Sequence, residues 1–436
     1  AGNIAGVDSL NLVGLPPQYG ADCRTVFAAG ESNGSPCVWQ STDDGQNYRR
    51  RFSRDPDTGA PFAIDAWAIA DDNTFYTGSF DGSYGMVYQT TNGGFFYSEG
   101  AMAGSQSLYF LALSPGYERD GTILAGNTNG WVYLSSDNGT SFQPLPGDAA
   151  SPPLTDSITV AFDPEFDSNR TVYTASNTAD GGIYHFVIST DTAWESIDGT
   201  MPAGTIFNGL TVIPGGTLYA VNYDSDGGME RSLNPTYTPG PSFETVTRGL
   251  EDGATLSGLW QSGQQLWSVD TTNIRLMTFY DTLILPATQV SPDDGTPGIG
   301  SLIDHTVRNI NLDWETLEGA TSYQWQCDYE TDFSSIPTGL EGTTTSSSVR
   351  LPALEPATTY YWRIRASAPV ISPWSEKWSF TTSLETTAIA LKPESPAAGA
   401  SGVPIKPLFQ WTAVAGANAY EFLVSRDANF KGRIQA

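Results

Sequence analysis

The most constraining feature of this sequence is a short turn motif that recurs along its first half. Residues 135–142 read Ser-Ser-Asp-Asn-Gly-Thr-Ser-Phe and follow the apolar run 130–134. An Asp side chain accepts hydrogen bonds from the N–H groups of a turn, and a Gly two residues later tolerates positive φ. We expect the closing aromatic residue to anchor the returning strand in a core. The motif therefore predicts a tight β-hairpin.

Related copies of the motif follow other apolar runs, roughly every 45 residues, which is the spacing of propeller blades. Two copies are complete, a third is softened, and a fourth is shortened and has lost its Gly. Their key positions are Ser41, Asp43, Gly45 and Tyr48; Thr90, Asn92, Gly94 and Tyr97; Ser135, Asp137, Gly139 and Phe142; and Ser189, Asp191 and Trp194. The motif resembles the Asp-box (BNR) repeat of sialidase-like β-propellers.

Each repeat contains short runs of apolar residues that predict four strands. The opening strands are expected at 9–15, 64–70, 107–113, 157–162, 207–213 and 254–260. Many short strands at a fixed period predict an all-β, six-bladed β-propeller over residues 1–289. The fifth and sixth repeats lack the box and carry 231–235 and 278–282 at the equivalent turns. A second turn pattern repeats at 17–22, 115–120 and 164–169 and is expected to be structural.

A second duplication begins beyond residue 290. Trp314, Gly319, Ala320, Tyr323 and Phe333 are matched, without a gap, by Trp411, Gly416, Ala417, Tyr420 and Phe430. The run Leu354-Glu355-Pro356-Ala357-Thr358-Thr359-Tyr360 has the form of a tyrosine corner, in which the phenol bonds back to the main chain. Residues 290–384 thus resemble a fibronectin type III module, a β-sandwich. Residues 385–436 resemble the N-terminal half of a second module, so we expect the chain to continue.

Charge and cysteine content narrow the classes of protein. Lys and Arg number 20 and Asp and Glu 48, a net charge of −28 that argues against nucleic-acid binding. The one basic cluster, Arg49-Arg50-Arg51 with Arg54, is expected on a solvated outer strand. Cys23 and Cys37 are a candidate disulfide within one blade. No apolar run reaches the roughly 18 residues of a membrane span.

The sequence contains no recognisable catalytic motif and only weak candidates for ligand-binding residues. Sialidases place an Arg-Ile-Pro motif on their first blade, and this chain has none, so no catalytic residue is carried over. His185 and His305 are expected in different domains, which argues against a His-based triad or metal site. Closely spaced loop carboxylates are candidate Ca²⁺ ligands, and Asn-x-Ser/Thr sequences are candidate glycosylation sites. These are Asp224, Asp226, Asp55 and Asp57 for calcium, and Asn33, Asn138 and Asn169 for glycans.

The sequence therefore predicts an exported, extracellular protein of a cell surface, without a catalytic site or a cofactor other than the Ca²⁺ just considered. The expected role is structural or adhesive, as a surface-layer, sheath or filament subunit or an adhesin. Its expected partners are further copies of itself or other surface proteins and glycans. The alternative is a glycoside hydrolase that pairs two carboxylates in the propeller cleft.

Overall fold

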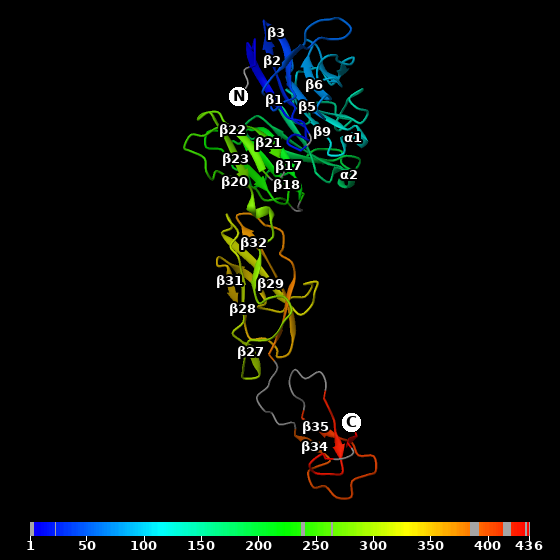
Figure 1. Ribbon diagram of the computed structural model, residues 1–436, viewed down its shortest axis with the longest axis vertical. Helices are drawn as coiled ribbons and strands as arrows, with labels where there is room; N and C mark the ends of the chain where they lie inside the picture. The colour runs from blue at the N-terminus through cyan, green and yellow to red at the C-terminus, as the bar shows by residue number, and fades with distance from the viewer. Residues whose placement is uncertain are drawn as a thin grey trace. The chain divides into compact units, whose positions relative to one another are not determined.

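The computed structural model describes residues 4–21, 23–236, 240–262, 265–383, 392–412, 420–431 and 434–435, and nearly all of its regular structure is β-strand. The chain forms two compact units, Ala1–Asp281 and Thr282–Ala436 (Figure 1). The sequence-based boundary lay after residue 289. Within the described part of the chain, none of the helices has the length and apolar character of a membrane-spanning segment.

The first unit contains six antiparallel sheets that follow one another along the chain. Within each sheet the strands pair in chain order, so that every sheet is a meander. Five sheets have four strands: β1–β4 (Ser9–Gly14, Val26–Ser32, Ser35–Ser41, Arg49–Phe52), β5–β8 (Ala66–Ile69, Phe75–Phe80, Gly85–Thr90, Ala101–Met102), β9–β12 (Leu108–Leu113, Ile123–Asn127, Val132–Ser135, Gln143–Pro144), β13–β16 (Ile158–Phe162, Thr171–Ser176, Ile183–Val187, Glu195–Ser196) and β17–β20 (Phe207–Ile213, Thr217–Asn222, Met229–Ser232, Glu244–Val246).

The sixth sheet has three strands instead of the four expected from the repeat: β21 (Leu256–Ser262), β22 (Gln265–Asp270) and β23 (Arg275–Tyr280). Residues 278–280, expected at a turn, belong to β23. After β23 the chain enters the second unit with the 3-10 helix η1 (Thr282–Ile284), and no fourth strand pairs with this sheet among the described residues.

The core of the first unit lies between successive sheets. The opening strands of neighbouring sheets contact one another, β5 with β9, β9 with β13, β13 with β17, and β17 with β21. Phe27 and Val38 of the first sheet share a buried cluster with Phe75 of the second. Because side chains alternate across a strand, each inner sheet buries one face against the preceding sheet and the other against the next.

Two of the turns predicted to be structural contain a single helical turn. They are α1 (Tyr117–Asp120) and α2 (Phe166–Asn169), each closed by a left-handed residue, Gly121 and Arg170. Phe166 is fully buried and packs against Phe162, with ring centroids 4.7 Å apart. The aromatic residue therefore folds back onto its own sheet.

The second unit has two sheets that share one core. The smaller has the order β24–β28–β31 (Gln289–Ser291, Asn311–Trp314, Ser348–Arg350). The larger has the order β25–β33–β32–β29–β30 (Thr296–Ile299, Trp378–Thr382, Thr359–Ala368, Ser322–Asp328, Glu341–Thr344). Trp314 from the smaller sheet and Trp325 and Trp362 from the larger meet in the core. A hairpin of β26 (Ser301–Ile303) and β27 (Thr306–Arg308) lies outside these sheets.

The remaining described residues of the second unit form two strand pairs. They are β34 (Pro393–Ser395) with β35 (Gln410–Trp411), and β36 (Val424–Ser425) with β37 (Ile434–Gln435). Trp411 is 36% exposed, whereas Trp314, its counterpart in the duplication, is 3% exposed. Gly416 and Ala417 lie outside the described residues.

Candidate functional site

The box carboxylates are bound by their own turns. In the first copy the Ser41 hydroxyl donates to Asp43 at 2.8 Å and accepts from the Gly45 N–H at 2.9 Å. Asp43 also accepts from the main chain of Asn47 at 2.9 Å and from its side chain at 2.7 Å. These hydrogen bonds, that of the Asn47 side chain foremost, lower the pKa of Asp43 to about 2.

The second and third copies repeat this geometry. The Thr90 hydroxyl donates to Asn92, which accepts from the main chain of Phe95 and Phe96. The Ser135 hydroxyl donates to Asp137 at 2.8 Å. A hydrogen bond from the Ser141 hydroxyl is the main cause that lowers the pKa of Asp137. The closing aromatics Tyr48, Tyr97 and Phe142 join the apolar clusters next to their turns.

The fourth copy has a different geometry, which follows from its missing Gly. Asp191 reaches backward to accept from the Val187 N–H at 2.7 Å, and Ser189 takes a positive φ of 85°. Trp194 packs against Phe186 and donates to the carbonyl of Leu145 at 2.9 Å. Trp194 therefore still packs against its sheet, although the turn before it differs from that of the other copies.

The fifth sheet retains part of the box that its sequence was expected to lack. The Ser232 hydroxyl donates to the Asn234 side chain at 3.2 Å and accepts from the Asn234 N–H at 3.4 Å. The Ser-x-Asn spacing after a strand was a signal of this geometry. It was easily missed because Thr236 and Pro239 stand where the other copies have Gly and the closing aromatic residue. Box carboxylates and amides thus serve as turn caps.

The tyrosine corner has the expected hydrogen bond. The Tyr360 hydroxyl accepts from the Glu355 N–H at 3.2 Å, and its ring stacks on Phe380 at 5.8 Å. Leu354 is buried in the same core. Pro356 precedes Ala357, which has a φ of 48°. Leu354, Pro356 and Tyr360 therefore position the start of β32.

Two of the four candidate calcium ligands, Asp55 and Asp226, accept main-chain hydrogen bonds through their carboxylates. Asp55 accepts from the N–H groups of Asp57 and Thr58, and from the Tyr88 hydroxyl at 3.0 Å. Asp226 accepts from the Gly253 N–H, and the carbonyl of Asp224 accepts from the Gly227 N–H. Over the described ranges, no group of three or more His, Cys, Asp and Glu side chains has the arrangement of a metal site.

Cys23 and Cys37 are free thiols in the structure, so the candidate disulfide between them is not formed. Cys37 is buried beside Trp39, and this burial raises the pKa of its thiol to about 11. Cys23 is half-buried, and its sulfur accepts from the Thr25 N–H at 3.3 Å.

The candidate glycosylation residues are exposed. Asn33 and Asn138 stand in turns with positive φ, 51° and 58°. Asn169 ends α2, and its side chain donates to Asp163 at 2.8 Å. A glycan at Asn169 would therefore compete with an internal hydrogen bond.

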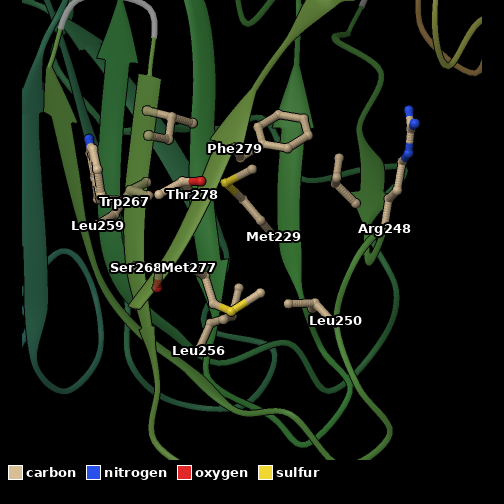
Figure 2. Close-up of a pocket in the computed structure, with 12 residues that line it drawn as sticks. Met229, Arg248, Leu250, Leu256, Leu259, Trp267, Ser268, Met277, Thr278 and Phe279 are labelled. Atoms are coloured by element: carbon tan, nitrogen blue, oxygen red, sulfur yellow. The ribbon is translucent and has the colours of Figure 1, made fainter. Parts of the chain in front are cut away.

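A small apolar cavity of about 50 Å³ lies between the fifth and sixth sheets. Figure 2 shows Met229, Leu250, Leu256 and Met277 pointing toward one another around it. Its size suits at most a water-sized molecule, and its apolar lining offers such a molecule few partners. We interpret this cavity as a packing defect between two sheets.

Two larger cavities open at turns of the first unit. One, of about 540 Å³, lies beside Leu113, Tyr117 and Glu118. The other, of about 590 Å³, is lined by Asp156 and Asp180 but by no aromatic residue. Asp156 accepts a hydrogen bond from the Ser157 N–H, and Asp180 accepts one from the Gly204 N–H of another loop. Neither cavity combines paired carboxylates with aromatic walls, the combination that the glycosidase alternative requires.

A buried polar network joins the fifth sheet to the end of the first unit. Arg231 of β19 forms ion pairs with Glu244 and with Asp281, and Asp281 also accepts from the Tyr219 hydroxyl at 2.7 Å. Burial by itself would lower the pKa of Arg231, but these two carboxylates raise it. Burial and Asp281 together raise the pKa of Tyr219.

The sixth sheet presents an apolar face away from the fifth. Trp260 is paired with Trp267, and Val269 with Leu276, so that these four side chains share one face of the sheet. Trp260 is 48% exposed and Leu276 62%. The opposite face, with Leu266 and Met277, lines the small cavity toward the fifth sheet, and Trp267 contributes to that lining as well. We call the side that bears Trp260, Trp267, Val269 and Leu276 the outer face of the sixth sheet.

No protein-family model matches the chain, and no curated protein matches it. Solved structures are similar to it. A YCF48 structure bound to D1 peptide is 15% identical, covers 60% of this chain and 75% of its own, and has a TM-score of 0.43. The GH74 enzyme of Niastella koreensis is 12% identical, with coverage of 84% and 65% and a TM-score of 0.41. Hydrazine synthase of Kuenenia stuttgartiensis is 10% identical, with coverage of 64% and 80% and a TM-score of 0.43. We transfer no activity from these proteins.

Proposed function

We propose that this chain is a self-associating structural protein of a cell surface. In this proposal the six sheets of the first unit are the blades of an Asp-box β-propeller, and the two-sheet core of the second unit is a fibronectin type III spacer. The propeller carries the contact surface, and the spacer holds it away from the rest of the protein. The protein is exported and acts outside the cell, and its function needs no cofactor.

The observation that carries the proposal is the outer face of the sixth sheet. Contiguous exposed apolar side chains on a soluble unit are typical of protein–protein contacts. The partner we propose is a second copy of the chain, bound through the same face. Arg275, which precedes Leu276 on β23, is already paired with Glu251 of the same chain. This arginine therefore does not call for an acidic partner. A face rich in Trp and Leu is best complemented by another apolar face, and a twofold axis supplies one.

Sedimentation velocity over a range of protein concentrations tests this proposal. We expect the sedimentation coefficient to rise with concentration for the unmodified chain. The double variant Trp260→Ser/Leu276→Ser should remain a monomer, because it removes the most exposed apolar area of the face. Val290→Ser, which changes a 48% exposed residue of the second unit, is the matched control and should associate normally. A monomer at every concentration, or equal association of all three proteins, would contradict the proposal.

A further inference from the structure

A cluster of arginine and phenylalanine side chains lies at the edge of the first sheet. It consists of Arg49, Arg50, Arg51 and Phe52 on β4 with Phe95 and Phe96 from the neighbouring turn, and we call it the arginine edge. Phe95 is 63% exposed and Phe96 67%. Their rings meet edge to face, with centroids 4.7 Å apart. These are large apolar surfaces on the outside of a soluble unit.

The arginines of this edge alternate between the two faces of the sheet. Arg51 reaches toward the second sheet, where it donates to the carbonyls of Asn92 and Gly93 and lies over the Phe95 ring at 5.5 Å. Arg50 points to the other face, donates to the Ser32 hydroxyl and lies over the Phe52 ring at 5.0 Å. Cation–π contacts hold a guanidinium in place without neutralising its charge.

No carboxylate of the described residues forms an ion pair with Arg49, Arg50 or Arg51, although the chain has 48 acidic residues. The carboxylates that flank β4 in the sequence are engaged elsewhere. Asp43 binds Asn47, Asp44 is paired with Arg24, and Asp55 accepts from the Thr58 N–H. Three consecutive positive charges therefore remain uncompensated on a chain of net charge −28. The arginine edge is therefore one of the few surfaces of this acidic chain that would attract a negatively charged partner.

The main chain of β4 narrows the class of partner. β4 is the outermost strand of its sheet, and among the described residues its partner strand is β3. In an antiparallel edge strand, alternate residues direct their N–H and C=O groups away from the sheet. An extended polypeptide satisfies such groups by adding a strand, whereas a glycan has no matching ladder of donors and acceptors.

We propose that the arginine edge binds an extended acidic segment of a partner protein as a fifth strand of the first sheet. Acidic side chains of the segment pair with Arg49 and Arg51 on one face of the sheet. Apolar side chains, which alternate with the acidic ones along the segment, pack against Phe52 on the other face. This site lies on a different sheet from the self-association face and uses different chemistry, so it does not rest on the proposed function.

Fluorescence anisotropy of a labelled peptide with alternating Glu and Val tests the proposal on the full chain. We expect saturable binding that weakens as salt is raised, because the charges are exposed. Arg49→Glu/Arg51→Glu should weaken binding by about tenfold or more. Arg119→Glu/Arg275→Glu makes the same change of net charge at arginines already paired with Asp167 and Glu251, and should bind as the unmodified chain does. Circular dichroism checks that both variants fold.

Two further peptides separate charge from strand addition. A peptide with Lys in place of Glu should not bind. A Glu-Val peptide with alternate N-methylated amides keeps every charge but loses half of its ladder donors, and should bind at least about tenfold more weakly. Hydrogen exchange of the β4 amides should slow in the complex. Equal binding of the N-methylated peptide overturns strand addition, and equal binding by the Arg49/Arg51 variant overturns the site. Absence of any peptide binding would contradict the proposal. The arginines would then serve to prevent β4 from pairing with strands of other molecules.

Discussion

At the scale of single residues, the recurring aspartates cap turns. In the first three copies the box hydroxyl bridges a carboxylate or amide and a main-chain N–H, as Ser41 does between Asp43 and Gly45. Gly139 shows how tightly the turn is built, because its φ is +75° and an added Cβ would lie 2.8 Å from the Tyr76 ring. The residue types of the motif predicted this role, since Ser, Asp and Gly have few other reasons to recur at this spacing.

The pH dependence of stability should reveal the bound Asp43 carboxylate. Its folded pKa of about 2 lies below the ordinary 3.8, so the charged form stabilises the folded state above pH 3.8. That stabilisation is lost as the pH falls through about 2. We expect Asp43→Asn to melt at a lower temperature than the unmodified chain at neutral pH, and the difference to shrink across this acidic window. Melting temperatures by circular dichroism measure it.

The exposed Asp57, changed to Asn, is the matched control for this measurement. The Asp57→Asn substitution removes the same charge from the loop that follows β4, where the carboxylate is not part of a box turn. Its melting-temperature difference from the unmodified chain should vary less with pH than that of Asp43→Asn. Parallel pH profiles for the two variants would show that the Asp43 hydrogen bonds do not stabilise the folded state.

At the scale of elements, the fifth and sixth sheets are held by a buried ion network as well as by apolar packing. Arg231 and Asp281 are 4% and 2% exposed, although they are far apart in the sequence. No local pattern identifies such a pair, because its partners are brought together only when β19 and the end of β23 meet. The sequence also did not predict that the sixth sheet has three strands in the described part of the chain. The apolar run of β23 resembles that of a strand in a four-stranded sheet, and only the strand pairing shows the difference.

Removing the cation of this network should be strongly destabilising. Arg231→Leu leaves the buried carboxylate of Asp281 without its arginine, and we expect a loss of about 3–5 kcal/mol in the free energy of unfolding of the first unit. Adding Asp281→Asn to this variant should restore part of the loss, because it also removes the buried negative charge. Urea unfolding followed by tryptophan fluorescence measures both. A loss below about 1 kcal/mol, typical of surface ion pairs, would contradict a buried network.

At the scale of the whole molecule, the two units have separate cores. Phe27 and Phe243 belong to buried clusters of the first unit, and the main cluster of the second unit runs from Ala287 to Phe380. Each core is large enough for its unit to unfold as a cooperative domain. Under our proposals, the contact surfaces belong to the first unit and the second unit is a spacer.

Calorimetry of the full chain should therefore show two unfolding transitions that respond separately to substitution. Trp362 and Phe27 are both 0% exposed, one in each unit. Trp362→Ala should lower only the transition of the second unit, by a loss of about 3–5 kcal/mol. Phe27→Ala should lower only the other by a similar amount. Two outcomes would show that the units unfold together. One is a single unfolding transition for the full chain, and the other is a shift of both transitions by each variant.

The sequence by itself determined the features that depend on neighbouring residues. These are the strands, the hairpin turns capped by Asp43 and Asp137, and the tyrosine corner of Tyr360, because strand alternation and turn chemistry act over a few residues. The tertiary structure alone decided which faces remained exposed. Whether Trp260 is buried, and whether Arg49, Arg50 and Arg51 find carboxylates, depends on which distant segments pack beside them. Burial and charge pairing are properties of the assembled sheets.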